Sequence, residues 1–561
     1  MTKQLTFADI VIFIIYFLIV SCYGYWVYRR KKTGEATSKE YFLAAGSLTW
    51  WAIGSSLIAS NISAEQMVGM SGNGFKMGIA IATYEWMAAA TLVIVAVFFI
   101  PVYLKNKIYT MPQFLHQRYN GTVAMIMAVF WLLLYVIVNL TSILFLGALA
   151  VHTISGIDTW VCIIGLAVFA VFITLGGMKV IGYTDVIQVF FLILGGLVTT
   201  YIAINLVSEH FHTTGIFNGL KIMGTQASDH FHMILKRDNP NYASLPGLTV
   251  LIGGMWIVNL NYWGCNQYIT QRALGADLKT ARSGILFAAF LKLLMPVIVV
   301  LPGIAAYILY KENVFHGELM QNGELNPDRS YPVLLNLLPS GLKGLSFAAL
   351  TAAVVASLAG KANSIATIFT MDIYKKFDPE MSEKKMVNVG KIAVVAAMII
   401  GVAICTHLGI DKKGGFDFIQ EYTGFVSPGI FAMFILGFFW KKSTSNAALF
   451  STIGGFVFSV VFKLLPLYTN LEGLKSIGFS TLVTQNDGVT KLWEIPFLDR
   501  MGIVFVICIV GMYIISMIEN AKGTRTHGLE VDSKMFKTTT GFAIGALIVL
   551  GIITALYTAL W

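Results

Sequence analysis

The sequence predicts an all-α integral membrane protein that folds as one bundle of transmembrane helices. The chain has 561 residues, of which 57% are hydrophobic and only 12% are charged, and its mean hydropathy is +0.74. A soluble protein of this length needs far more polar surface to cover its core. Apolar runs of about 20 residues, enough to cross a bilayer, recur from one end to the other. A single membrane domain over residues 1–561 follows.

Fourteen segments are predicted to cross the membrane. The first is expected to stay in the mature protein, because its apolar run is too long for a signal peptide and the basic residues 29–32 follow it. The fourteen segments lie near residues 7–28, 48–72, 77–104, 121–152, 157–177, 182–206, 247–271, 281–310, 339–373, 388–408, 415–439, 444–466, 500–518 and 539–560.

The placement of lysine and arginine predicts that both termini lie outside an inner or plasma membrane. Basic residues gather in alternate loops, which the positive-inside rule assigns to the cytoplasm. The long segments 207–246, 311–338 and 467–499 fall on the other side; Lys412 and Lys413 in a short outer loop do not fit the rule. We attribute the net charge of +10 to these basic loops. We therefore expect the chain to be embedded in a lipid bilayer and not to bind nucleic acid.

Two spans are interrupted by polar or helix-breaking residues near mid-depth. The second contains SNISAEQ at residues 60–66, and the seventh contains Gly253, Gly254, Asn259 and Asn261. Irregular backbone at this depth is tolerated only where it is buried or lines a cavity. Two broken spans at corresponding positions, five spans apart and running in opposite directions, predict a substrate site at the middle of the membrane.

Polar side chains in the apolar spans indicate what such a site binds. Taken singly, an intramembrane amide forms only a helix–helix hydrogen bond about as often as it contacts a ligand. Glu85 and Lys292 are costlier to bury, and they should face each other or a wet cavity. Amides both donate and accept, which suits a ligand with many hydroxyls. Tyr84, Tyr262, Trp263 and Phe416 can cover the apolar face of a sugar ring, although ordinary packing explains each of them singly at least as well. The polar set is Gln66, Glu85, Asn139, Asn259, Lys292 and Gln420.

No enzyme is predicted. The sequence lacks a G-x-S-x-G elbow, an H-E-x-x-H motif and a Walker A loop. Its five cysteines show no paired spacing and are interpreted as free thiols. We therefore expect no cofactor and no metal cluster.

Several stretches resemble the sodium/solute symporter family, and within it the sodium/glucose cotransporter branch. The stretches are LIASNISAEQ at 57–66, YEWM at 84–87, YTDVIQ at 183–188, NLNYWGCNQY at 259–268, IFTMDIY at 368–374, QEYTG at 420–424 and GFFWKK at 437–442. The resemblance implies sodium-coupled hexose symport by alternating access. It also implies a LeuT-like inverted five-plus-five repeat, approximated by 47–271 and 247–440, with accessory helices in 441–561.

The resemblance also implies roles for individual residues. The sugar contacts fall on Asn61, Gln66, Glu85, Asn259, Lys292 and Gln420. The gates fall on Met70, Tyr84 and Phe416 outside and on Tyr262 inside. The sodium ligands are oxygens of Ala59, Ile62, Ala353 and Ser357, as a hard cation requires, and Asp185 lies on the sodium route to the cytoplasm. The sugar set overlaps closely with the polar residues singled out above.

The sequence departs from the family pattern at the sodium site. Ala356 stands where a second serine is expected, and Lys361 stands four residues after Ser357, on the same helix face and roughly 16 Å along the helix from Asp372. One hypothesis is that the Lys361 ammonium replaces sodium, which makes transport sodium-independent or proton-linked. The other is that Lys361 pairs with Asp185 or another acid and leaves a weakened sodium site.

Three smaller departures concern the sugar. Ala88 and Gly360 replace serines, and Asn261 replaces a tyrosine beside the gate. Two alternatives to hexose transport stay open: a symporter for another polar solute, such as an amino acid, sialic acid or vitamin, and a membrane sugar sensor without turnover. The retained amides, carboxylate and ammonium favour a sugar as the small-molecule partner.

Overall fold

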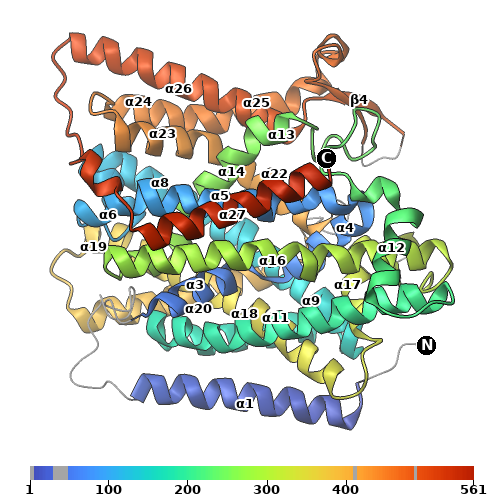
Figure 1. The fold of residues 1–561 in the computed structure, drawn as a ribbon. Coiled ribbons are helices and arrows are strands. Elements are labelled where there is room, and N and C mark those ends of the chain that lie inside the picture. Colours follow the sequence, from blue (N-terminus) through green and yellow to red (C-terminus); the bar gives the residue numbers. More distant parts are fainter. Residues whose placement is uncertain (1–4, 30–47, 322, 408–413, 486–488) are drawn as a thin grey trace.

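Long helices that run roughly along one common direction dominate the computed structural model (Figure 1). The structure describes residues 5–29, 48–321, 323–407, 414–485 and 489–561. The helices of the first half are α1 (Phe7–Arg29), α3 (Trp50–Asn61), η2 (Glu65–Met70), α4 (Ser71–Met77), η3 (Gly78–Ala82), α5 (Thr83–Ile94), η4 (Val95–Phe99), α6 (Ile100–Lys105), α7 (Met111–Arg118), α8 (Gly121–Leu133), η5 (Leu134–Leu140), α9 (Thr141–Ser155), α10 (Thr159–Thr174), α11 (Gly177–His210), α12 (Ile216–Gln226), η6 (Ser228–Phe231), α13 (Thr249–Ile252), α14 (Gly254–Cys265) and α15 (Gln267–Leu274).

The second half continues the helical bundle and adds two small antiparallel hairpins. Its helices are α16 (Leu278–Lys311), η7 (Pro327–Arg329), α17 (Ser330–Leu335), α18 (Leu342–Thr367), η8 (Ile368–Tyr374), α19 (Lys375–Phe377), α20 (Glu383–Ile404), α22 (Gly415–Gly424), α23 (Ser427–Phe439), α24 (Ser445–Leu449), η9 (Phe450–Gly454), α25 (Gly455–Leu464), η10 (Leu465–Leu467), η11 (Glu472–Lys475), α26 (Phe497–Ala521), η12 (Ser533–Phe536) and α27 (Thr540–Ala559). The hairpins pair β1 (Met320–Gln321) with β2 (Glu324–Leu325), and β3 (Thr481–Thr484) with β4 (Lys491–Glu494).

The described helices account for ten of the fourteen predicted spans by length and hydropathy alone. The other four predicted spans are those at 48–72, 157–177, 247–271 and 415–439. The first and third are broken helices, the second is the short apolar helix α10, and the last is the pair α22 and α23, which is bent by 50°. These four are apolar but interrupted or short, so their crossing of the membrane stays a prediction.

The second span breaks where the polar sequence predicted it. Helix α3 ends at Asn61, Ile62 is extended, and η2 starts at Glu65. The Ser63 hydroxyl accepts a hydrogen bond from the Glu65 amide (3.3 Å), and the Gln66 side-chain oxygen accepts one from the Ser63 amide (3.3 Å). This reciprocal arrangement resembles a capping box, so the same polar residues that interrupt the span also restart the helix.

The seventh span is broken twice. Gly253 separates α13 from α14, as the Gly253-Gly254 pair predicts, and Asn266 in an extended conformation separates α14 from α15. Gly254 allows close packing, because an added Cβ would lie 2.1 Å from the Leu498 carbonyl oxygen. The break at Asn266 lies inside the bundle, where Asn266 lines a pocket, whereas Ile252 beside the break at Gly253 is 83% exposed.

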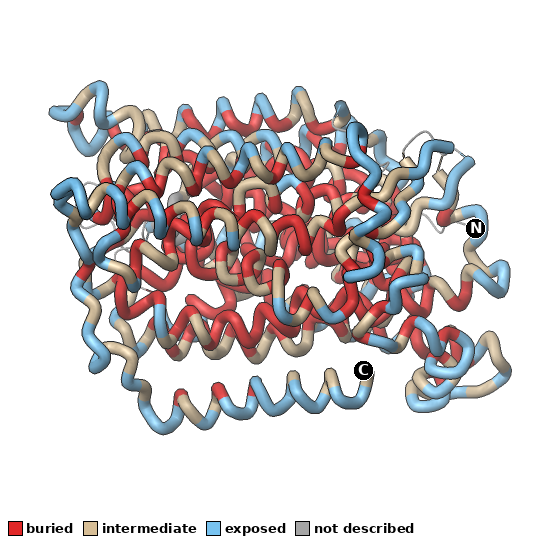
Figure 2. The backbone as a smooth tube through the Cα atoms, turned by 90° about the horizontal axis from the view of Figure 1, so that it is seen from above, coloured by how far each residue is buried: buried red, intermediate tan, exposed pale blue. Residues whose placement is uncertain are grey.

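Different connections lie at the two ends of the bundle. The short basic connections around α6 and α19 lie at one end, whereas α12, the β3–β4 hairpin and the C-terminal end of α27 lie at the other (Figure 1). The basic residues 30–32 and the exceptions Lys412 and Lys413 lie outside the described residues. Buried residues concentrate in the middle of the bundle, and α27 at its margin is largely exposed (Figure 2), as expected for helices that face lipid.

Candidate functional site

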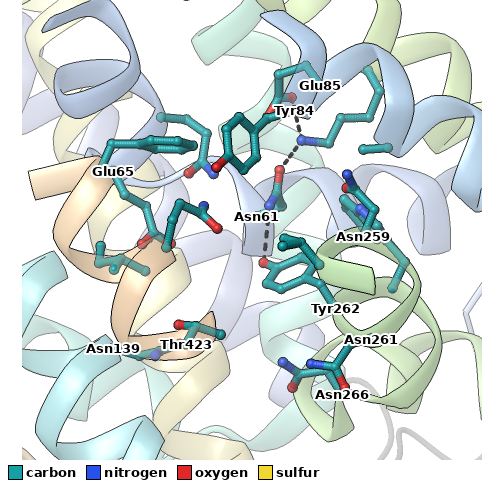
Figure 3. Close-up of a pocket in the computed structure, with 18 of the residues that line it drawn as sticks. Asn61, Glu65, Tyr84, Glu85, Asn139, Asn259, Asn261, Tyr262, Asn266 and Thr423 are labelled. Carbon is teal, nitrogen blue, oxygen red and sulfur yellow. Dashed lines mark hydrogen bonds and ion pairs between the residues drawn. The ribbon is translucent and has the colours of Figure 1, made fainter. Parts of the chain in front are cut away.

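The two broken spans border a buried pocket in the middle of the bundle. All six residues at the predicted sugar-contact positions line it, and they come from six helices: α3, η2, α5, α14, α16 and α22. Figure 3 shows three of these side chains, Asn61, Glu85 and Asn259, turned toward a common space. The polar lining residues are Asn61, Glu65, Gln66, Tyr84, Glu85, Asn139, Asn259, Asn261, Tyr262, Asn266, Lys292, Gln420 and Thr423.

Lys292 contacts several other residues that line this pocket. Its ammonium donates to the Glu85 carboxylate and to the Asn61 side-chain oxygen, and lies 5.2 Å from the ring centroid of Trp263. The side chains of Lys292 and Glu85 are only 1% and 3% exposed. Pairing with each other is how two such charges are tolerated in the membrane interior, and it matches the prediction that they face each other.

A chain of hydrogen bonds joins this wall to the break in the second span. The Asn61 amide nitrogen donates to the Tyr262 hydroxyl (3.1 Å), and the Tyr262 hydroxyl contacts that of Tyr268. Tyr268 in turn donates to the Ser60 carbonyl oxygen (2.9 Å). One of the carbonyls at the end of α3 is thereby satisfied by a side chain from the other broken span, as helix ends inside a membrane require.

Three of the four predicted gate residues line the pocket. Tyr84 and Phe416 meet edge to face, with ring centroids 4.9 Å apart, and Tyr262 lies on the other side of Asn61 (Figure 3). Met70 is fully buried in η2 but is not among the lining residues. The aromatic pair therefore closes one side of the pocket without contribution from Met70.

The enclosed space is small. It measures about 60 Å³, and since a buried water needs roughly 10–15 Å³ by the same measure, it holds a few waters. Ligand sites for small molecules span about 300–1,000 Å³. The side chains around the pocket must therefore separate before a small-molecule ligand fits.

Lys361, the unexpected cation of the ninth span, pairs with an acid of the pocket. Its ammonium lies 3.2 Å from the Glu65 carboxylate, with side-chain exposures of 1% and 7%, and 5.2 Å from the ring centroid of Tyr268. Of the acids considered for it, the partner is therefore not Asp185. The ion pair joins α18 directly to η2, the segment that follows the break in the second span.

The four predicted sodium-ligand residues lie where α18 meets the end of α3. Ala59, Ile62, Ala353 and Ser357 are all buried. The Ser357 hydroxyl donates to the Ser60 carbonyl oxygen (3.2 Å). Carbonyl and hydroxyl oxygens thus meet at the break, and they are of the kind that a hard cation prefers.

Asp185 belongs to a separate buried cluster. It accepts a hydrogen bond from the Ser56 hydroxyl (2.6 Å), which itself accepts one from the Arg272 guanidinium (2.8 Å). Arg272 packs against α18, since an added Cβ at Gly360 would lie 2.7 Å from its Nη2 atom. The absence of a side chain at Gly360 therefore makes room for the arginine.

Comparison with known proteins identifies the family. The Sodium:solute symporter family profile matches residues 41–455. The chain belongs to this family. A sodium/glucose cotransporter of Vibrio parahaemolyticus is 45% identical over 99% of both chains. The human sodium/myo-inositol cotransporter 2 is 33% identical over 82% of this chain and 70% of its own length. This family member also shares its fold with the solved structure of a Na+-coupled sialic acid symporter (TM-score 0.74, 22% identity, 91% and 98% of the two chains).

Sequence reasoning missed the position of Glu65 in this symporter-family site. The residue was visible as part of the polar interruption, but its role as partner of Lys361 depends on how α18 packs against η2, which no sequence pattern reports. Asn266 and Thr423 also line the pocket without having been predicted. Asn261 donates to the Ser427 hydroxyl (3.1 Å), so this departure from the family pattern fastens α14 to α23.

Proposed function

We propose that the chain carries a hexose, such as galactose or glucose, across the membrane by alternating access. The observation that supports this most is the convergence of amides, a carboxylate and an ammonium from six helices on one enclosed pocket. Hydroxyls donate and accept, and amides match them from either side. The names of the relatives, a sodium/glucose and a sodium/myo-inositol cotransporter, point to the same chemical class, neutral polyols.

Within this proposal each polar residue has a distinct task. Gln66, Asn259 and Gln420 offer amides to the hydroxyls of the sugar. Lys292 and Glu85 exchange their mutual contact for hydrogen bonds to the sugar, which widens the pocket. Because the ion pair already sits in a dry environment, it presents preorganised donors and acceptors that need little further desolvation.

The gates follow from the aromatic contacts. We propose that Tyr84 and Phe416 separate to admit the sugar from the outside, together with Met70 of η2. Tyr262 covers the inner side and moves with α14, whose ends at Gly253 and Asn266 are the breaks of the seventh span. Breaks at both ends allow this helix to tilt as a unit.

Sodium is the proposed co-transported ion, bound by oxygens of Ala59, Ile62, Ala353 and Ser357 and leaving past Asp185. The pairing of Lys361 with Glu65 supports this reading, because a neutralised ammonium repels a nearby cation far less than a free one. Sodium at this place would draw α18 and the end of α3 together, and so link its own binding to the shape of the sugar pocket.

A second candidate is sodium-independent or proton-linked sugar transport. One specific observation favours it: the Lys361–Glu65 ion pair already joins α18 to the broken span, which is the task that a sodium ion would perform. Under this reading the ammonium is a permanent substitute, and protonation changes of the pair set the coupling.

The membrane topology is part of the proposal. Fourteen spans, both termini outside, and inverted repeats approximated by 47–271 and 247–440 with accessory helices in 441–561 give the two broken helices their symmetric positions around the pocket. Rocking of one repeat against the other around a fixed site would then expose the pocket alternately to the two sides.

Uptake of labelled glucose or galactose into proteoliposomes tests the proposal and separates the two coupling modes. We expect uptake to depend on sodium outside, and to be lost when choline replaces it. Equal rates in both media favour the second candidate. Gln420→Ala should reduce uptake, whereas Gln117→Ala, a change of the same type at an exposed position, should not.

Two further readings are distinguished by the same vesicles. A membrane sugar sensor binds the hexose but gives no net flux. If the chain is a symporter for another polar solute, an excess of an amino acid or sialic acid suppresses the measured flux, whereas an excess of a hexose does not. Neither result is expected from the lining of the pocket.

A further inference from the structure

A second lysine–glutamate pair borders the central pocket, in addition to the pair of Lys292 and Glu85. It joins Lys361 of α18 to Glu65 at the start of η2, and the Lys361 ammonium donates to Glu65 Oε1 (3.2 Å). Glu65 lines the pocket (Figure 3), whereas Lys361 is not among the lining residues. The pocket therefore meets the carboxylate of this pair and not its ammonium.

The two pairs are built alike. In each of them a buried ammonium bonds to a carboxylate that lines the pocket. The ammonium of the first pair lies 5.2 Å from the ring centroid of Trp263, and that of the second lies 5.2 Å from the ring centroid of Tyr268. Glu85 is one of the residues to which the proposed function assigns a sugar contact. The same construction around Glu65 indicates the same task.

One oxygen of the Glu65 carboxylate has no partner in the protein. Oε1 accepts from Lys361, but Oε2 is buried and accepts no hydrogen bond from any of the described residues. An ionised carboxylate has lone pairs for about four hydrogen bonds, and a buried acceptor that stays unpaired destabilises the fold. Since Glu65 lines the pocket, a hydroxyl group that enters the pocket can supply the missing donor.

The next residue along the chain offers the complementary group. Gln66 Oε1 accepts a hydrogen bond from the Ser63 amide (3.3 Å), so its amino group, a donor, is what Gln66 presents to a ligand. The Glu65 amide donates to the Ser63 hydroxyl (3.3 Å), which fixes the main chain from which both side chains extend. A donor and an acceptor at consecutive lining residues match two neighbouring hydroxyls of a sugar.

We propose that Glu65 is a further sugar contact, whose Oε2 accepts a hydrogen bond from one hydroxyl, and that Lys361 is the positioning residue that holds its carboxylate. The proposal rests on the proposed function for the hexose, and it holds for either coupling ion. Glu65 and Glu85 then give the pocket two charge-assisted acceptors, each neutralised by a lysine. Because a carboxylate only accepts, Glu65 selects sugars that carry a free hydroxyl at the contacted position.

Competition by deoxyglucoses, each of which lacks a different hydroxyl, tests this proposal. The inhibition constant of each analogue and of unlabelled glucose is measured for uptake of labelled glucose into proteoliposomes that contain the full chain. Glu65→Met/Lys361→Met removes both charges together, a change that buried pairs often tolerate. The constant for glucose should rise about 10- to 160-fold, the effect of losing one hydrogen bond to a charged group. For the analogue that lacks the contacted hydroxyl, the constant should be the same in the variant as in the wild type.

Two further variants complete the test. Asp378→Met/Lys385→Met makes the same change in an exposed ion pair and should leave every inhibition constant unchanged. Glu65→Asp keeps the charge beside Lys361 but withdraws the carboxylate from the pocket by one methylene group. It should raise the constants for the same sugars as the double variant, and it decides the question if the double variant does not fold.

The outcomes separate failure of this proposal from failure of the proposed function. An unchanged constant for glucose in the Glu65 variants overturns the contact and leaves hexose transport standing. A rise by the same factor for every analogue does so too, because the loss is then structural and not tied to one hydroxyl. Absence of labelled hexose uptake by the wild type overturns the proposed function, and the Glu65 contact with it.

Discussion

Removal of the Lys361 ammonium is the most informative single perturbation of the buried ion pair. Lys361→Met keeps most of the side-chain volume but leaves the Glu65 carboxylate without its partner. At 3.2 Å and an effective dielectric constant of about 20, the Coulomb attraction is about 5 kcal/mol. Removal of one partner of a buried pair usually costs about 3–5 kcal/mol, because the other charge stays buried and unpaired.

The double variant Glu65→Gln/Lys361→Met distinguishes the cost of an unpaired charge from the cost of lost packing. It removes both charges, so no unpaired carboxylate remains, and we expect it to recover most of the stability that either single variant loses. Lys385→Met is the matched control, since Lys385 also pairs with an acid, Asp378 at 2.6 Å, but on the surface, with 51% and 32% of the two side chains exposed. Exposed pairs contribute little.

The assay is the free energy of unfolding of each variant in detergent micelles under one set of conditions. The reasoning is refuted if Lys361→Met destabilises the chain no more than Lys385→Met does. It is also refuted if the double variant is as unstable as the worse of the two single variants, because the loss would then come from packing and not from an unpaired charge.

The remaining predictions concern the substrate, the packing and pH. Gln420→Ala should raise the KM for hexose uptake about 5- to 160-fold, the effect of losing about 1–3 kcal/mol of hydrogen bonding, with little change in thermal stability. Gly303→Ala should prevent correct folding, measured as loss of a monodisperse peak in size-exclusion chromatography, because its Cβ would lie 2.1 Å from the Ser71 carbonyl oxygen. Burial raises the pKa of Asp328, outside the spans and bonded to the Gly415 amide. Its contribution to stability is therefore present at low pH and is lost as pH rises through that pKa, and Asp328→Asn should flatten this part of the pH–stability curve.

The sequence predicted the broken spans because their polar residues have no other explanation at that depth. SNISAEQ contains both the interruption and the capping residues Ser63 and Gln66 that restart the helix. Likewise, the cost of burying Glu85 and Lys292 predicted that they face each other or a wet cavity, and the structure shows the first of these alternatives. Of the residues that line the common pocket, Asn61, Gln66 and Asn259 lie on the broken spans, whereas Glu85 and Lys292 come from α5 and α16.

Other features depend on tertiary packing and left no trace in the sequence pattern. A buried Lys361 needs an acidic partner, and the sequence offers several acids that could lie near it. Only the packing of α18 against η2 selects Glu65. Met70 is buried but is not among the residues that line the pocket, a distinction that the sequence pattern does not report. The β3–β4 hairpin in the long segment 467–499 was not predicted, because its strands are short and their partners are set by the loop between them.

Counterflow of labelled hexose in proteoliposomes tests the central claim most directly, because exchange of sugar for sugar requires the buried polar pocket to open to both sides whatever ion is coupled. Vesicles loaded with unlabelled glucose should take up labelled glucose rapidly and transiently in the wild type. Asn259→Ala, which removes one amide from the pocket, should slow this exchange strongly. Exchange at the wild-type rate in Asn259→Ala and in Gln420→Ala would show that the sugar does not pass through this pocket, and would contradict the account.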